Sequence, residues 1–248
     1  MAEINLLSEC GVIDADTLSG TTTNASYPRY NVTDFNIHTQ WRSVGTGTET
    51  LIADFGAGNT HSADCVAIHH ELDVGSYMKI YYDDSGYQQI GSPQEITSNN
   101  SPILFWDLGA TYTSRYFKLE FYNLSTVAKV NVWFLGTMET ISLVYNYGNP
   151  HASPNYGVSQ VESYGGVVRS VQKRESRKIW VVNWKALDST NKGYLDTMMS
   201  NCGGGQYPMF FEDPDGDDHL VRVMTPSLNA TEIAHTYFDV GTVLQEEL

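Results

Sequence analysis

The chain has 248 residues, enough for one large β domain or two domains of ordinary size. Its 14 Lys and Arg against 29 Asp and Glu give a formal net charge of −15. Because attraction to phosphate needs a basic face, this charge argues against specific nucleic-acid binding and against attachment to an anionic membrane.

The cysteines and the N-terminus bound the class of protein further. Cys10, Cys65 and Cys202 lie far apart in the sequence without a C-x-x-C pair, so we expect reduced core residues and not a disulfide framework or a zinc site. The segment "MAEINLLSEC" has no basic region followed by an apolar run, and no stretch approaches the ~20 apolar residues that span a bilayer. We therefore expect synthesis in a cytosol, no recognisable export signal and no membrane insertion.

The first part of the chain, up to about residue 138, has the pattern of short strands separated by turn residues. In "RYFKLEFYN", Phe117, Leu119 and Phe121 alternate with polar or amphipathic residues, which is typical of a half-buried strand. The stretches "CVAIHH", "YMKIYYDD" and "VNVWFL" are similar, and no convincing helical period occurs. Many short strands at this spacing predict a β-sandwich.

From about Ile141 the pattern changes to strands around one helix. The strand "KIWVVNW" places two tryptophans and a valine on one face, and "LDSTNKGYLDTMMSNCGGG" has the apolar spacing of a helix. Asp188 or Ser189 can cap its start, and the glycines that follow Cys202 can end it. We expect Trp180, Val182 and Trp184 to pack against this helix. A hairpin around "YPMFFEDPDGDDHLVRVM" and a last strand follow.

The hairpin carries an acidic turn, residues 212–218, for which two interpretations are open. The spacing of its aspartates resembles the start of a calcium loop, but Asp218 replaces the required Gly and Met224 the required Glu. Asp-Pro-Asp-Gly is also a strong turn sequence, and solvated carboxylates at a turn cost little. We favour the interpretation as a turn over that as a metal site. The segment's five carboxylates belong to Glu212, Asp213, Asp215, Asp217 and Asp218.

No catalytic constellation stands out elsewhere. His69 and His70 are adjacent, so in a strand they point to opposite faces and cannot share a metal ion. No H-x-x-x-H, G-x-S-x-G or Gly-rich phosphate motif occurs. The sequence therefore predicts that the histidines assemble no site and that the chain is not an enzyme.

A basic link is unusual in so acidic a chain. It is interpreted either as a solvated hairpin tip or as a contact surface, facing acidic residues of another copy or enclosed nucleic acid. Charge complementarity of this kind fixes register more than it adds affinity. Its positive residues are Arg169, Lys173, Arg174, Arg177 and Lys178.

The first part resembles the galactose-binding-like jelly roll of discoidin and coagulation-factor C-type domains, over roughly residues 5–137. "TDFNIHTQW" is similar to the family's D-G-[DN]-x-x-T-x-W, and "IADFG", "YMKIYYDDSGYQQI" and "SRYFKLEF" resemble further motifs in the same order. The resemblance implies a jelly-roll β-sandwich, expected as a domain over residues 1–138.

The same resemblance implies two kinds of site. Asp34, Asn36 and Thr39 match the family loop that holds a structural calcium ion, the one cofactor expected here, although Phe35 stands where the family has Gly. Family loops at one end of the sandwich bind sugars or lipid headgroups, while we expect Trp41 in the core. The residues expected to supply stacking faces and donors are Tyr27, Arg29, Tyr30 and Arg42.

The second part resembles the tail-tube-like domain of bacteriophage minor tail and distal tail proteins, over about residues 141–248. The order of motifs carries the likeness: "RSVQKRESRKIWVVNWKAL", one helix, a Gly-rich stop, then "YPMFFEDPDGDDHLVRV". The resemblance implies a tail-tube-like β-sandwich or barrel with one helix, expected as a domain over residues 139–248. The predicted fold class is mainly β.

Together the resemblances imply a structural virion protein, made in the bacterial host cytoplasm, that forms a ring, expected as a hexamer, at or near the distal tip of a phage tail. Its jelly roll would decorate the tail or contact the host surface. The implied partners are further copies, neighbouring tail-tube and tail-tip proteins, and a host-surface glycan. The alternative is a carbohydrate-binding, lectin-like protein, and a more distant one is a glycan hydrolase, which would need a carboxylate pair.

Overall fold

The computed structural model describes residues 3–21, 23–83, 86–97, 102–142, 152–155, 158–162, 168–172, 176–213, 215–225 and 227–247. Contacts within the chain define two units. The sandwich unit comprises Ile4–Ile141 and Met209–Leu220, and the C-terminal unit comprises Met1–Glu3, Ser142–Pro208 and Val221–Leu248. The division into domains at residues 138 and 139 stays a prediction.

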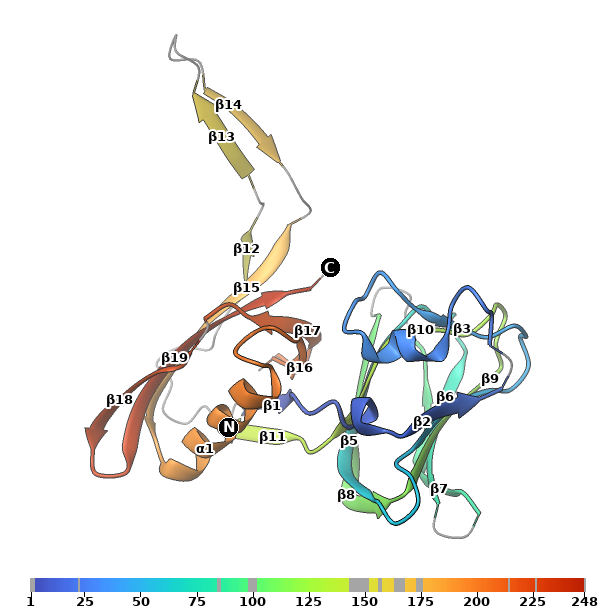
Figure 1. Cartoon of the computed structure of the whole chain (residues 1–248). Helices are drawn as coiled ribbons and strands as arrows, with labels where there is room; N and C mark the ends of the chain where they lie inside the picture. The colour runs from blue at the N-terminus through green and yellow to red at the C-terminus, as the bar shows by residue number, and fades with distance from the viewer. Residues whose placement is uncertain are drawn as a thin grey trace. The chain divides into compact units, whose positions relative to one another are not determined.

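The sandwich unit contains two antiparallel sheets (Figure 1). One sheet has the order β2-β4-β9-β6-β7 and the other β3-β10-β5-β8. The first consists of β2 (Thr17–Gly20), β4 (Glu49–Asp54), β9 (Tyr116–Tyr122), β6 (Tyr77–Asp83) and β7 (Gln88–Glu95). The second consists of β3 (Trp41–Arg42), β10 (Lys129–Gly136), β5 (His61–His70) and β8 (Ile103–Ser114).

Alternation along the strands fills the core between these sheets. Phe117, Leu119 and Phe121 of β9 are fully buried, as their spacing predicts, while the residues between them are half-buried. Trp41 is also fully buried, and its indole Nε1 donates to the Thr23 hydroxyl over 3.3 Å. The predicted mainly β fold with an N-terminal β-sandwich is therefore confirmed.

A segment from late in the chain completes the sandwich unit. Strand β1 (Glu3–Leu7) pairs antiparallel with β16 (Met209–Glu212), so that Leu7 lies opposite Phe210. The Phe210 ring packs edge-on against Phe134 at a centroid distance of 5.1 Å, and Phe210 belongs to the same buried cluster as the sandwich core. Strand β11 (Glu139–Ser142) is the other neighbour of β1, and β17 (Asp218–Val223) neighbours β16.

The C-terminal unit is built on the antiparallel pair β15 (Arg177–Leu187) and β19 (Tyr237–Glu246). Trp180, Val182 and Trp184 of β15 are buried on the face that α1 (Ser189–Asn201) covers, as predicted. The remaining strands are β12 (Ser153–Asn155), β18 (Asn229–Ala234) and the hairpin of β13 (Val158–Glu162) with β14 (Val168–Gln172).

The helix α1 begins and ends at the predicted signals. The Asp188 carboxylate accepts the backbone N–H of Asn191 over 2.8 Å, so Asp188 and not Ser189 is the cap. After Cys202 the chain turns through glycines with positive φ. At Gly205 (φ 93°) a Cβ would lie 2.3 Å from the Val223 carbonyl oxygen, so only glycine fits there.

Two further expectations concern the cysteines and the surface. Cys10, Cys65 and Cys202 are buried and unpaired, as predicted, and burial raises the pKa of each thiol.

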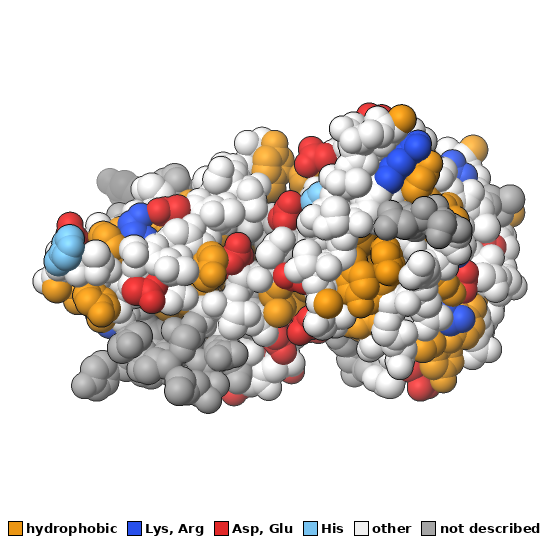
Figure 2. All heavy atoms as spheres, turned by 90° about the horizontal axis from the view of Figure 1, so that it is seen from below, with side chains coloured by type: hydrophobic (Ala, Val, Ile, Leu, Met, Phe, Trp, Pro, Cys, Tyr) orange, Lys and Arg blue, Asp and Glu red, His pale blue; other side chains and the backbone are white. Residues whose placement is uncertain are grey.

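The face drawn in Figure 2 carries dispersed acidic side chains and few lysines or arginines, in keeping with the net charge of −15. Among the described residues no helix combines the length and the apolar character that crossing a bilayer demands.

Candidate functional site

A groove of about 470 Å³ lies on the sandwich unit beside two short 3-10 helices, η1 (Gly11–Asp14) and η2 (Arg29–Thr33). Both helices are single turns that the strand pattern of this region does not predict. They bring residues from η1, β2 and η2 to one rim. The polar and apolar side chains that line the groove include Ile13, Asp16, Thr17, Thr23, Arg29 and Tyr30.

Arg29 is held in place by the strand end beside it. Its Nη2 donates to the carbonyl oxygens of Gly20 and Thr21 over 3.3 and 3.0 Å. The preceding Pro28, with φ −70°, starts η2 and fixes the direction in which the chain enters this turn. The guanidinium group therefore lies in the groove wall as a fixed donor group, not as a mobile surface arginine.

Tyr30 and Ile13 supply exposed apolar surface to the same groove. Tyr30 is 68% exposed and Ile13 is 53% exposed. Asp16 and Thr17, also exposed, add a carboxylate and a hydroxyl. The groove thus combines an aromatic ring with charged and polar groups.

The four residues expected to bind a ligand separate into two pairs. Arg29 and Tyr30 line the groove, whereas Tyr27 and Arg42 contact each other. The Arg42 guanidinium carbon lies 3.7 Å from the centroid of the Tyr27 ring, a cation–π contact. In addition, the backbone N–H of Arg42 donates to the backbone carbonyl of Tyr27 over 3.3 Å. The ligand-binding role of all four stays a prediction.

The predicted ion loop is a closed turn whose three residues meet. The Asp34 carboxylate accepts the Asn36 N–H over 2.9 Å and the Thr39 hydroxyl over 2.7 Å. A carboxylate and neighbouring oxygens fit the donor chemistry of calcium, which takes six to eight oxygen ligands. In the present arrangement the side-chain oxygens of Asp34 and Thr39 are engaged with each other. The calcium ion therefore stays a prediction for these residues.

Phe35, within the predicted ion loop, has a left-handed backbone conformation. Its φ is 58°, in the left-handed region that costs a non-glycine residue about 1 kcal/mol. The ring packs edge-on against Phe134 at a centroid distance of 5.7 Å, and this core contact offsets the strain.

Only part of the basic link lies within the described residues. Lys173 and Arg174 lie outside them, and of Arg169 only the backbone, in β14, is described. Arg177 lies 3.9 Å from Glu247 of the same chain, and Lys178 is exposed. The role of this segment as an assembly surface stays a prediction.

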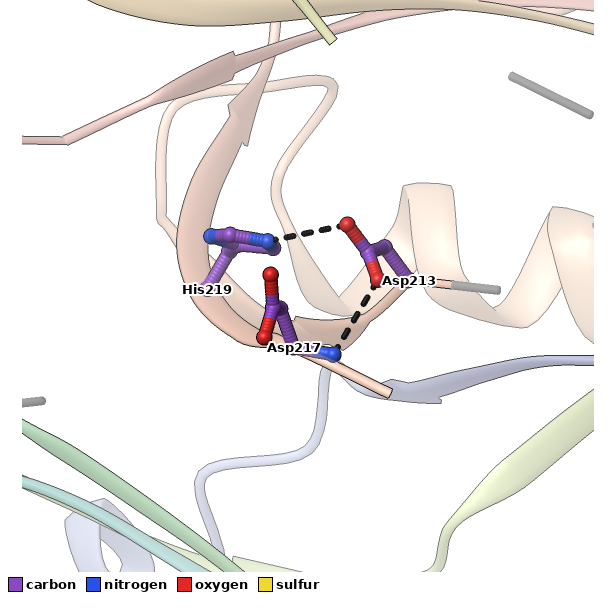
Figure 3. A group of neighbouring side chains, drawn as sticks. All are labelled: Asp213, Asp217 and His219. Atoms are coloured by element: carbon purple, nitrogen blue, oxygen red, sulfur yellow. Dashed lines mark hydrogen bonds and ion pairs between the residues drawn. The ribbon is translucent and has the colours of Figure 1, made fainter. Parts of the chain in front are cut away.

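The acidic turn forms the predicted hairpin turn, with one correction. The backbone of Asp213 donates to Asp217 over 2.9 Å, and Gly216 (φ 84°) donates back to Asp213 over the same distance. The Asp213 side chain, however, is buried, and its Oδ2 lies 3.2 Å from His219 Nε2 (Figure 3). The expectation that the turn carboxylates are solvated is therefore wrong for Asp213. That the histidines assemble no site stays a prediction.

The reason is the register of the hairpin. His219 is the second residue of β17, and the chain returns after the turn so that its imidazole reaches the Asp213 carboxylate. The spacing D-x-x-x-D-x-H across a four-residue turn is the signal that could have indicated this cluster. The neighbouring Asp218 is half-buried, and this burial together with Glu212 raises its pKa to about 6.

No family model and no curated protein matches this chain. Among solved structures, the chain is similar to the family 32 carbohydrate-binding module of C. perfringens NanJ, solved with galactose, at 13% identity and a TM-score of 0.44, covering 55% of this chain and 99% of that one. A pectin-binding carbohydrate-binding module is similar at 14% identity and a TM-score of 0.40, covering 52% and 91%. A putative alpha-L-fucosidase from Bacteroides thetaiotaomicron matches at 15% identity and a TM-score of 0.43, with 53% of this chain and 29% of that chain covered.

Proposed function

We propose that the chain is a carbohydrate-binding protein and that the groove beside η1 and η2 is its binding site. The observation that carries the proposal is the exposed Tyr30 ring beside the fixed Arg29 guanidinium and the Asp16 carboxylate in a groove of about 470 Å³. A groove of this size falls in the range of about 300–1,000 Å³ that is usual for small-ligand sites.

The chemistry of these side chains suits a sugar ring. A pyranose has an apolar C–H face that packs on an aromatic ring, and its edge carries hydroxyls that both donate and accept hydrogen bonds. Tyr30 offers the ring, Arg29 offers donors only, and Asp16 offers acceptors only. Because Arg29 is already held by two carbonyl groups, little side-chain entropy would be lost when a ligand binds.

A glycan array probed with the wild-type chain, followed by calorimetry on its best ligand, tests this proposal. We expect Tyr30→Ala to lower the affinity at least tenfold, because the stacking surface is lost. Tyr237→Ala, which removes an exposed tyrosine of the C-terminal unit, is the matched control and should bind like wild type. A wild-type chain that retains no glycan, or two variants that bind equally, would contradict the proposal.

A second candidate function, a structural role in a phage tail, is favoured by the order of elements from β15 to β17. Strand, capped helix, glycine stop and acidic hairpin follow one another in the order that the tail-protein resemblance implies. In addition, β12 pairs only with Arg177–Ile179, so among the described residues the side of β15 opposite β19 has no strand partner from Val181 to Leu187. Such an edge is a template for pairing with another chain. A ring of copies would cover it, and the sandwich unit would then present the groove to host glycans.

The assembly state of the purified chain tests this second function. We expect a closed homo-oligomer by sedimentation and particle imaging, lost on Val181→Lys, since Val181 is 56% exposed on β15. Val74→Lys places the same charge at a similarly exposed valine of the sandwich unit and should leave the oligomer intact. A strictly monomeric wild type would leave carbohydrate binding as the function of an isolated chain and remove the ring.

A further inference from the structure

Asp213, Asp217 and His219 converge at the base of the acidic turn (Figure 3). One ligand atom from each lies within 4.8 Å of the other two. The His219 and Asp213 side chains are only 5% and 9% exposed, whereas Asp217 lies at the surface. The cluster is thus buried on one side and open to solvent on the other.

The turn itself orients the Asp213 carboxylate. Its Oδ1 accepts the backbone N–H groups of Asp215 and Asp217 over 2.9 and 3.1 Å, which fixes the rotation of the carboxylate. The second oxygen, Oδ2, therefore faces His219 Nε2 at 3.2 Å. The Phe211 ring neighbours the imidazole, with ring centroids 6.1 Å apart and an interplanar angle of 34°.

We propose that Asp213 Oδ2, the Asp217 carboxylate and His219 Nε2 bind a divalent transition-metal ion, with Zn²⁺ the best fit and water as the fourth ligand. Zinc bonds to imidazole nitrogen and carboxylate oxygen are about 2.0–2.2 Å long, so two ligand atoms of a tetrahedral site lie roughly 3.3 Å apart. The Nε2–Oδ2 distance of 3.2 Å matches this separation. The exposed Asp217 side leaves room for the water.

The ligand set also selects among metals. An imidazole nitrogen suits zinc and other late transition metals, whereas calcium and magnesium prefer oxygen ligands only. Two carboxylates balance the charge of a divalent ion in a site that is nine-tenths buried at two of its three ligands. The site is therefore different from the calcium loop that the aspartate spacing first suggests. It does not depend on either proposed function.

The same geometry would also serve a simple hydrogen bond between His219 and Asp213, and Asp217 distinguishes the two. A hydrogen-bonded pair has no need of the Asp217 carboxylate, which lies at the surface, whereas a zinc site loses one of three protein ligands without it. Asp215 is another exposed aspartate of the same turn and does not belong to the cluster. Asp217→Asn and Asp215→Asn are therefore a matched pair.

The experiment is calorimetric titration of the chelator-treated full chain with Zn²⁺, and separately with Ca²⁺, together with thermal melts in both ions. We expect one Zn²⁺ per chain and a higher Tm by mass action. Asp217→Asn should weaken zinc binding at least tenfold, His219→Gln should abolish it, and Asp215→Asn should bind like wild type. Circular dichroism of each variant checks that it is folded. No zinc binding by wild type, or equal binding by Asp217→Asn and Asp215→Asn, would overturn the site.

Discussion

Arg115 and Asp54 form a two-pronged ion pair at the end of β4. Arg115 Nε donates to Asp54 Oδ1 over 2.7 Å, and Nη2 donates to Oδ2 over 2.9 Å. Hydrogen bonding from Arg115, and secondarily from the Gly56 N–H, lowers the pKa of Asp54 below its usual value. The Asp54 carboxylate thus joins Arg115, in the turn between β8 and β9, to Gly56, in the loop that follows β4.

Because of this pair, we expect the stability of the folded chain to fall at low pH. Because the folded pKa of Asp54 lies below its unfolded value, its contribution is present above the unfolded pKa and is lost as pH falls through the folded pKa. Asp54→Asn should therefore destabilise the chain by about 1 kcal/mol at pH 7, since the pair is partly exposed to solvent. Urea unfolding at pH 7 and pH 3 measures this, and an equal cost at both pH values would show that the charge is not involved.

For Asp218 we expect the opposite dependence of stability on pH. Its pKa is raised to about 6, mainly by burial and then by Glu212. A carboxyl whose folded pKa is raised stabilises fully below its unfolded pKa, and this contribution is lost as pH rises through about 6. At neutral pH the ionised Asp218 carboxylate therefore lowers the free energy of unfolding. Asp218→Asn should stabilise the chain by about 1–2 kcal/mol at pH 7.5 and have little effect at pH 4.

Chelator should be present in the Asp218 measurements so that zinc binding next to the residue does not contribute. Asp215→Asn, an exposed carboxylate on the same turn, is the control and should show no such pH dependence. A destabilised Asp218→Asn at pH 7.5 would mean that the ionised carboxylate is needed where it lies.

The tryptophan face of β15 should carry much of the stability of the C-terminal unit. Trp180 and Trp184 are 0% and 2% exposed against α1, so truncation of either to Ala should cost about 3–5 kcal/mol. Val181→Ala, on the opposite and exposed face of the same strand, should cost less than about 0.5 kcal/mol. Chemical denaturation of the three variants would test this, and equal losses would place the tryptophans outside the core.

Calcium should stabilise the chain through the turn of Asp34, Asn36 and Thr39. If the ion binds, calcium raises Tm by mass action, and Asp34→Ala and Thr39→Ala remove this gain to the same extent. Asn123→Ala is a suitable control because Asn123 is exposed in a turn far from Asp34 in the sequence. Identical melting of wild type with calcium and with chelator would eliminate the calcium site.

Local features of this protein follow from the sequence because their causes are local. Alternation in "RYFKLEFYN" predicts the burial of Phe117 and Leu119, and Asp188 with the glycines after Cys202 bounds the only α-helix among the described residues. These patterns depend on neighbours within one strand or one helical turn. The turn at Asp213–Gly216 is local in the same sense.

The register of a hairpin and the packing of loops determined the sites. The return of β17 at a fixed register turns one aspartate of a surface loop inward to His219, which composition and motif spacing left unconnected. Likewise, Arg29 and Tyr30 share a groove while Tyr27 stacks on Arg42, although all four stand within one short stretch of sequence. The alternation of apolar and polar residues in a strand predicts which of its faces is buried. Only the tertiary structure decides which distant segment meets that face, because strand order and register depend on the packing of the whole sheet.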